Sequence, residues 1–112
     1  INATEEYNGS SWTNGGNLIS ATTQLSGSGL QTAALAYGGT TDGSSKTTTE
    51  QYNGTSWTAS ASLSAPRLSG GAAGTENSSA AYFGGNQPSA STSATTEEFE
   101  GGGPTTLTVG TD

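Results

Sequence analysis

The sequence predicts an all-β fold built from repeated units of antiparallel strands. Tyr-Asn-Gly-Ser-Ser-Trp at 7–12 and Tyr-Asn-Gly-Thr-Ser-Trp at 52–57 lie 45 residues apart. A double glycine at 38–39 returns after 46 residues, at 84–85, and Thr-Glu-Gln-Tyr at 49–52 is matched after 47 residues by Thr-Glu-Glu-Phe. Three anchors with nearly the same shift indicate a repeat, and a period of about 45 residues is typical of stacked β-units.

Short segments within one unit have the length and composition of strands. The apolar runs 32–37 and 78–83 end at a double glycine and are too short for helices of ~10–12 residues. Thr-rich segments follow at 47–52 and 94–99 and predict strands with one solvent-exposed face. Gly-rich stretches upstream of each apolar run, at 24–28 and 67–73, are weaker strand candidates.

Turn residues complete each unit. The Asn-Gly pairs at 8–9 and 53–54 stand between candidate strands, and they predict tight hairpins because both residue types tolerate positive φ. Each unit then holds four antiparallel strands, with Tyr52 on the third and Trp57 on the fourth. Four short strands cannot bury both faces of their sheet, so units must stack. At ~40–50 residues per unit, radial stacking gives a β-propeller.

Two segments resemble the kelch repeat family: Ala-Leu-Ala-Tyr-Gly-Gly at 34–39 before Tyr52 and Trp57, and Ala-Ala-Tyr-Phe-Gly-Gly at 80–85 before Phe99. The resemblance implies four-stranded, kelch-like blades whose second strand ends in the double glycine. The chain departs from the family pattern in its smaller residues before the glycines and in a hairpin shortened to Asn-Gly-x-x. The repeats are also similar to kelch-like repeats of phage structural proteins.

The phase of the repeat predicts about two and a half blades. Residues 1–17 form a partial blade with the third and fourth strands, 18–62 a complete blade, and 63–112 a second blade with an atypical C-terminal capping strand at Thr105–Val109. Because propellers typically close at 4–8 blades, one copy cannot complete a ring. We expect either a segment of a longer polypeptide, which the start within a blade favours, or the association of several chains.

Composition and charge exclude several classes of partner. Among 112 residues, nine acidic side chains face only Lys46 and Arg67, which gives a net charge of -7. Phosphate binding needs clustered cations, so we expect neither nucleic acid nor an anionic membrane surface as a partner. Membrane insertion is not expected either, since no run approaches the ~20 apolar residues of a spanning helix.

The chemistry of catalysis is nearly absent from the sequence. There is no His and no Cys, which removes the common general base and the thiol nucleophile. The adjacent pairs Glu5-Glu6 and Glu97-Glu98 point to opposite faces of a strand and predict a solvated strand edge. A calcium site at Asp42 or Glu76 is a weaker alternative, and the sequence predicts no metal, no cofactor and no enzyme.

The loops are the natural recognition surface. We expect the loops 40–46 and 86–93 to share one face with the connections 13–23 and 58–66. The candidate binding side chains on that surface are Asp42, Lys46, Arg67, Asn86 and Gln87.

The sequence therefore favours a non-enzymatic structural or adhesive module of an extracellular or virion surface. Such a module, of the fibre or capsid-decoration type, would display its loops to a receptor or glycan. Its partners would be other copies, other structural proteins of the assembly, or a cell-surface glycan or protein. An intracellular protein-interaction scaffold of the kelch type is the alternative, and a propeller hydrolase or lyase depending on Glu50 or Glu76 is the third class.

Overall fold

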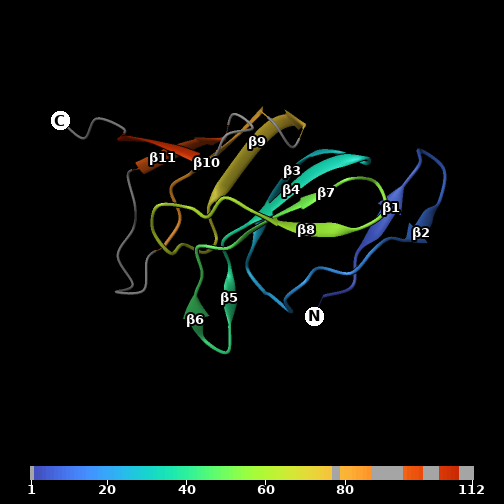
Figure 1. The fold of residues 1–112 in the computed structure, drawn as a ribbon, viewed down its shortest axis with the longest axis horizontal. Helices are drawn as coiled ribbons and strands as arrows, with labels where there is room; N and C mark the ends of the chain where they lie inside the picture. The colour runs from blue at the N-terminus through green and yellow to red at the C-terminus, as the bar shows by residue number, and fades with distance from the viewer. Residues whose placement is uncertain (1, 77–78, 87–94, 100–103, 109–112) are drawn as a thin grey trace.

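The computed structural model of the chain describes residues 2–76, 79–86, 95–99 and 104–108 (Figure 1). The described residues contain strands and no helix, and every strand pairing is antiparallel, so the predicted all-β class is confirmed. The strands are β1 (Glu5–Tyr7), β2 (Trp12–Asn14), β3 (Ser26–Leu30), β4 (Ala33–Tyr37), β5 (Thr40–Thr41), β6 (Ser44–Ser45), β7 (Thr49–Tyr52), β8 (Trp57–Ser60), β9 (Gly71–Glu76), β10 (Ser79–Phe83), β11 (Thr95–Phe99) and β12 (Pro104–Thr108).

Two four-stranded sheets follow the order of the chain. One has the order β3-β4-β7-β8 and the other β9-β10-β11-β12, while β1 and β2 form a separate hairpin. Tyr7 is paired with Trp12 in that hairpin as Tyr52 is paired with Trp57 in β7 and β8. The predicted four-stranded unit is therefore present twice, and its second half once. The sheets do not close into a ring.

Asn-Gly hairpins are present, but their turns differ from the prediction. Four residues separate the paired Tyr7 and Trp12, and of the Asn-Gly pair only Gly9 has positive φ, at 97°. Asn8 acts through its side chain instead, because its Oδ1 accepts the N–H groups of Ser10 and Ser11 at 2.9 Å. The same two bonds recur at the second hairpin, at residues 53–56. Asparagine is favoured here as a local hydrogen-bond acceptor.

The double glycines end β4 and β10 with two consecutive residues in the left-handed region. Gly38 and Gly39 have φ of 70° and 89°, and the second pair has nearly the same values. A Cβ at Gly39 would lie 2.6 Å from Thr22 Cγ2 and 2.7 Å from the carbonyl oxygen of Thr23. Glycine is required both by φ and by this close approach of the backbone.

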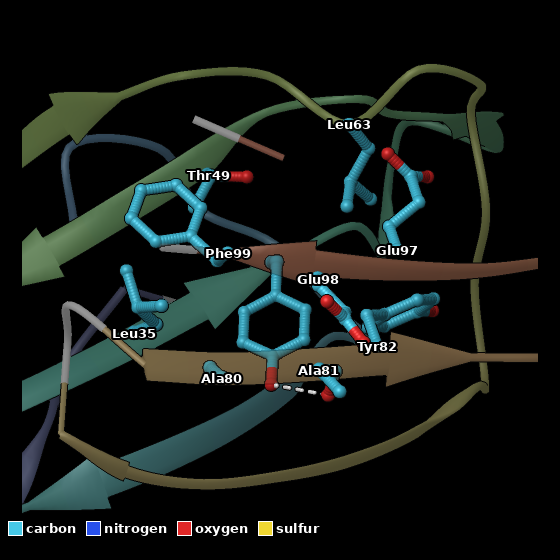
Figure 2. Close-up of a pocket in the computed structure, with 10 residues that line it drawn as sticks. Leu35, Thr49, Leu63, Ala80, Ala81, Tyr82, Glu97, Glu98 and Phe99 are labelled. Atoms are coloured by element: carbon cyan, nitrogen blue, oxygen red, sulfur yellow. Dashed lines mark hydrogen bonds between the residues drawn. The ribbon is translucent and has the colours of Figure 1, made fainter. Parts of the chain in front are cut away.

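The main core lies between the two four-stranded sheets, at what we call the second junction (Figure 2). It consists of buried side chains from both sheets and from the connection between them: Leu35, Tyr37, Leu63, Tyr82 and Phe99. The rings of Tyr37 and Tyr82 meet edge to face, with centroids 5.0 Å apart. Strands β3 and β9 lie side by side along this junction (Figure 1).

The first junction lies between the β1–β2 hairpin and the sheet β3-β4-β7-β8. The Tyr52 hydroxyl donates to the carboxylate of Glu6, and it accepts the N–H of Gly16 at 3.3 Å. The hydrogen bond to Glu6 raises the pKa of Tyr52 above its ordinary value. Gln31 also donates to Glu6, at 3.4 Å. Polar contacts therefore hold this junction, whereas apolar side chains fill the second.

Candidate binding surface

The described loops gather at one end of the two sheets and form what we call the loop face: residues 20–24, 38–46, 61–69 and 84–86. Of the predicted loop 86–93, all residues after Asn86 lie outside the described residues. Three isolated backbone pairings join these segments to one another: Thr23 with Thr40, Lys46 with Arg67, and Leu68 with Asn86. The hairpin turns 31–32 and 53–56 lie together at the opposite end of the sheet. A Cβ added to Gly54 would lie 3.4 Å from the Cβ of Thr32. The loop face is thus a connected surface rather than a set of separate loops.

The strands β5 and β6 form a small hairpin that projects from the loop face (Figure 1). Its two-residue turn is Asp42-Gly43, with φ of 52° and 81°, and Asp42 is exposed. The hydroxyl of Thr41 donates to the carbonyl of Ala21 at 3.0 Å and ties the hairpin to the neighbouring loop. This hairpin was not predicted, although Asp-Gly between two short Thr/Ser pairs is the sequence signal for it.

Lys46 and Asn86 are held mainly through their backbones. The N–H of Lys46 donates to the carbonyl of Gly39 at 2.9 Å, and its own carbonyl accepts the N–H of Arg67 at 3.2 Å. Lys46 is half-buried, whereas Asn86 is exposed and exchanges two backbone hydrogen bonds with Leu68. Gln87 lies outside the described residues. Of the predicted candidates, Asp42, Lys46 and Asn86 are therefore on the loop face with solvent contact.

Arg67 is not on the surface, so the prediction of an exposed Arg67 is wrong. Its exposed fraction is 0%, and its Nη2 lies 2.5 Å from Oε2 of Glu97, which is 1% exposed. The guanidinium carbon also lies 5.7 Å from the centroid of the Tyr82 ring. A buried guanidinium needs such partners because desolvation penalises an isolated charge. The buried side chain of Arg67 therefore anchors the loop segment 61–69 to Glu97 of the second four-stranded sheet.

Two buried glutamates hold the connections between units, a role that was not predicted from the sequence. Oε1 of Glu50 accepts the N–H of Ile19 at 2.6 Å, and Oε1 of Glu97 accepts the N–H of Ser64 at 2.7 Å. Both carboxylates are buried, so the prediction of a solvated strand edge is wrong for Glu97. The sequence does contain a signal for this role. The Thr-Glu pair of the third strand is repeated at 49–50 and 96–97, and a leucine of the connection is repeated at 18 and 63.

The exposed residues of the loop face are mostly polar. A pocket of about 130 Å³ beside it is lined by Ile19, Ser20, Thr48, Thr49, Glu50, Ala59, Ser60 and Ser62. Its volume is below the ~300–1,000 Å³ typical of small-molecule sites. Among the described residues, no three or more acidic, His or Cys side chains are grouped to hold a metal ion.

Comparisons with models of known protein families and with curated proteins give no match to this chain. The likeness to kelch repeats therefore depends on the double glycines and the Tyr–Trp hairpins themselves. Within the described residues, no helix is long and apolar enough to cross a membrane.

Proposed function

We propose that this chain is a non-enzymatic structural or adhesive module of an extracellular or virion surface, and that its loop face binds a receptor or glycan. The observation that carries the proposal is an exposed polar hairpin, β5–β6, which projects from the loop face of a repeated framework. Glu50 and Glu97 hold the two inter-unit connections by the same backbone contact. On that repeated framework, the first four-stranded unit carries a projecting hairpin with Asp42 at its tip. The corresponding residues 87–92 of the second unit lie outside the described residues.

The composition of the hairpin favours a neutral polar ligand. Residues 40–46 read Thr-Thr-Asp-Gly-Ser-Ser-Lys, so hydroxyl groups outnumber charges. Hydroxyl and carboxylate oxygens are suitable partners for the hydroxyl groups of a sugar or the amides of a peptide. A net charge of -7 disfavours phosphate-rich ligands. The sheets would serve as blades of an incomplete kelch-like propeller, which presents the same face of each unit to the ligand.

Glycan binding by the chain displayed in many copies on a particle tests the adhesive role, because avidity can raise weak binding ~10²–10⁴-fold. Replacing Asp42 and Ser44 together with alanine should reduce binding to the recognised glycan or receptor by about tenfold or more, since both lie on the projecting hairpin. The matched control is Thr55→Ala, in the exposed turn at the opposite end of the sheet.

Unchanged binding by the Asp42/Ser44 variant, or an equal loss in the Thr55 control, would contradict recognition by the loop face. If the displayed chain binds no glycan and no surface protein, the adhesive role is wrong and a purely structural module remains.

A further inference from the structure

Large apolar side chains are exposed at both ends of the stack of units. At one end are Tyr7 and Trp12, 47% and 64% exposed, which we call the N-terminal end face. At the other end are Ala81, Phe83 and Glu98, which we call the C-terminal end face. Ala81 and Glu98 are directly paired across β10 and β11, so their side chains share one face of the sheet. Phe83 lies on the same face of β10 by strand alternation and is 43% exposed.

The counterpart of Tyr7 within the stack is covered by a neighbouring unit. Tyr52 is only 3% exposed, although its ring packs on Trp57 with nearly the same geometry as Tyr7 on Trp12. The centroid distances are 4.9 Å and 5.0 Å, and the interplanar angles 34° and 36°. The two hairpins therefore have the same local structure. The difference is that the β1–β2 hairpin covers Tyr52 at the first junction, whereas no described residues cover Tyr7 in the same way.

The C-terminal end face shows the same relation to its own counterparts. By the 46-residue shift, Leu35 corresponds to Ala81 and Tyr37 to Phe83. Leu35 and Tyr37 are 2% and 4% exposed, because the following sheet covers them at the second junction. In addition, an open hollow of about 410 Å³ lies on strands β9–β11, and small residues make up most of its lining. The lining includes Ala81 and Glu98 of the C-terminal end face, together with Ala80 and Phe99 of the opposite face of the sheet. This hollow has room for aromatic side chains.

Two facing positions change together between the first junction and the second junction. At the first junction, the Glu6 carboxylate accepts the hydrogen bond of the Tyr52 hydroxyl. At the second junction, the corresponding positions hold Gln51 and Phe99, so the carboxylate and the hydroxyl are absent together. Gln51 instead accepts a hydrogen bond from Ser60 of its own sheet. The carboxylate and the tyrosine are therefore both present at the first junction and both absent from the second.

The positions left over at the two ends are Glu98 and Tyr7, which again combine a carboxylate with a tyrosine. We propose that the C-terminal end face of one copy of this chain binds the N-terminal end face of a second copy, and that Glu98 accepts a hydrogen bond from the partner's Tyr7. Such head-to-tail contacts are heterologous, so they build a closed ring or a filament. The inference deepens the proposed function, since it names the partner and would array several loop faces on one assembly.

Sedimentation of the 112-residue chain from micromolar to millimolar concentration tests the contact. Moderate salt is needed to screen the repulsion between two chains of charge -7. The mass should rise above the 11.0 kDa of one chain. Trp12→Ala and Phe83→Ala should each weaken association by about tenfold or more, as expected for aromatic residues at the centre of an interface. Ile19→Ala, at a side chain that is 59% exposed and precedes the loop-face segment 20–24, is the matched control and should not weaken it.

A mixture of two variants separates this contact from other modes of association. The Trp12→Ala chain keeps its C-terminal end face, and the Phe83→Ala chain keeps its N-terminal end face. At a concentration above the dissociation constant of the wild-type contact but below that of the variants, each variant alone should remain largely monomeric, whereas their mixture should form a heterodimer of about 22 kDa, twice the mass of one chain. Circular dichroism of each variant checks that its strands are intact.

The inference is overturned if the wild-type chain stays at 11.0 kDa throughout, if the mixture stays monomeric, or if Ile19→Ala weakens association as much as Trp12→Ala. The Asp42/Ser44 variant should assemble normally, so loss of ligand binding and loss of assembly can be told apart. A double-mutant cycle of Tyr7→Phe and Glu98→Ala should show coupling, because each change alone removes the same hydrogen bond.

Discussion

Replacing Arg67 with methionine should lower the free energy of unfolding by about 3–5 kcal/mol, the usual loss when one partner of a buried ion pair is removed. The carboxylate of Glu97 would remain buried, at 1% exposed, without its cation. Methionine keeps much of the side-chain volume, so the loss reports the charge more than a cavity. Denaturant unfolding followed by circular dichroism measures it. A domain of this size has ~5–15 kcal/mol in total, so the variant should be only marginally stable.

Two variants control for the change of charge. Lys46→Met makes the same change in net charge on the neighbouring, half-buried loop residue and should alter stability by less than ~0.5 kcal/mol. Adding Glu97→Gln to Arg67→Met should recover part of the loss, because the amide carries no charge and its oxygen can still accept the N–H of Ser64. Equal losses in Arg67→Met and Lys46→Met would contradict the buried pair.

Replacing Leu35 with alanine should cost about 2–5 kcal/mol, the range for truncating a buried leucine. Leu35 is 2% exposed in the second junction, where it packs with Tyr82 and Phe99 (Figure 2). The change removes apolar contact area and leaves a cavity between two sheets that cannot bury these faces separately. Thermal or denaturant unfolding gives the difference.

Leu30→Ala is the matched control for that prediction, because Leu30 lies on adjacent strand β3 but is 55% exposed. It should change stability by less than ~0.5 kcal/mol. Similar small effects at both leucines would show that the two sheets do not pack against each other in solution.

Repetition made the strands predictable, because each weak local signal occurred two or three times. The double glycines marked the ends of β4 and β10, and the Asn-Gly pairs marked the hairpins. The strand β3 begins at Ser26 and β9 at Gly71, later than predicted, since Gly-rich sequence gives little periodicity from which to place a boundary. The β5–β6 hairpin was missed because two-residue strands have no pattern of their own.

The candidate site was less predictable, because burial depends on contacts distant in sequence. Arg67 read as a loop cation, yet its partner Glu97 lies 30 residues further along the chain, on the next sheet. Likewise, Tyr7 and Tyr52 have nearly identical sequence surroundings and opposite exposure. Only the placement of one unit against another distinguishes them. Sequence repeats therefore locate equivalent positions, but which copies are covered follows from stacking.

Each unit covers aromatic side chains of the next unit, and the two tryptophans report this stacking separately. Trp12 is 64% exposed, whereas Trp57 is half-buried and its indole Nε1 has no appreciable exposed surface. Iodide quenching of Trp→Phe variants, at a dilution where the chain is monomeric, reports each indole separately. Stacking of the units predicts strong quenching of Trp12 and a several-fold weaker effect at Trp57. Equal quenching of both would contradict the stacking of units on which the loop face and the end faces depend.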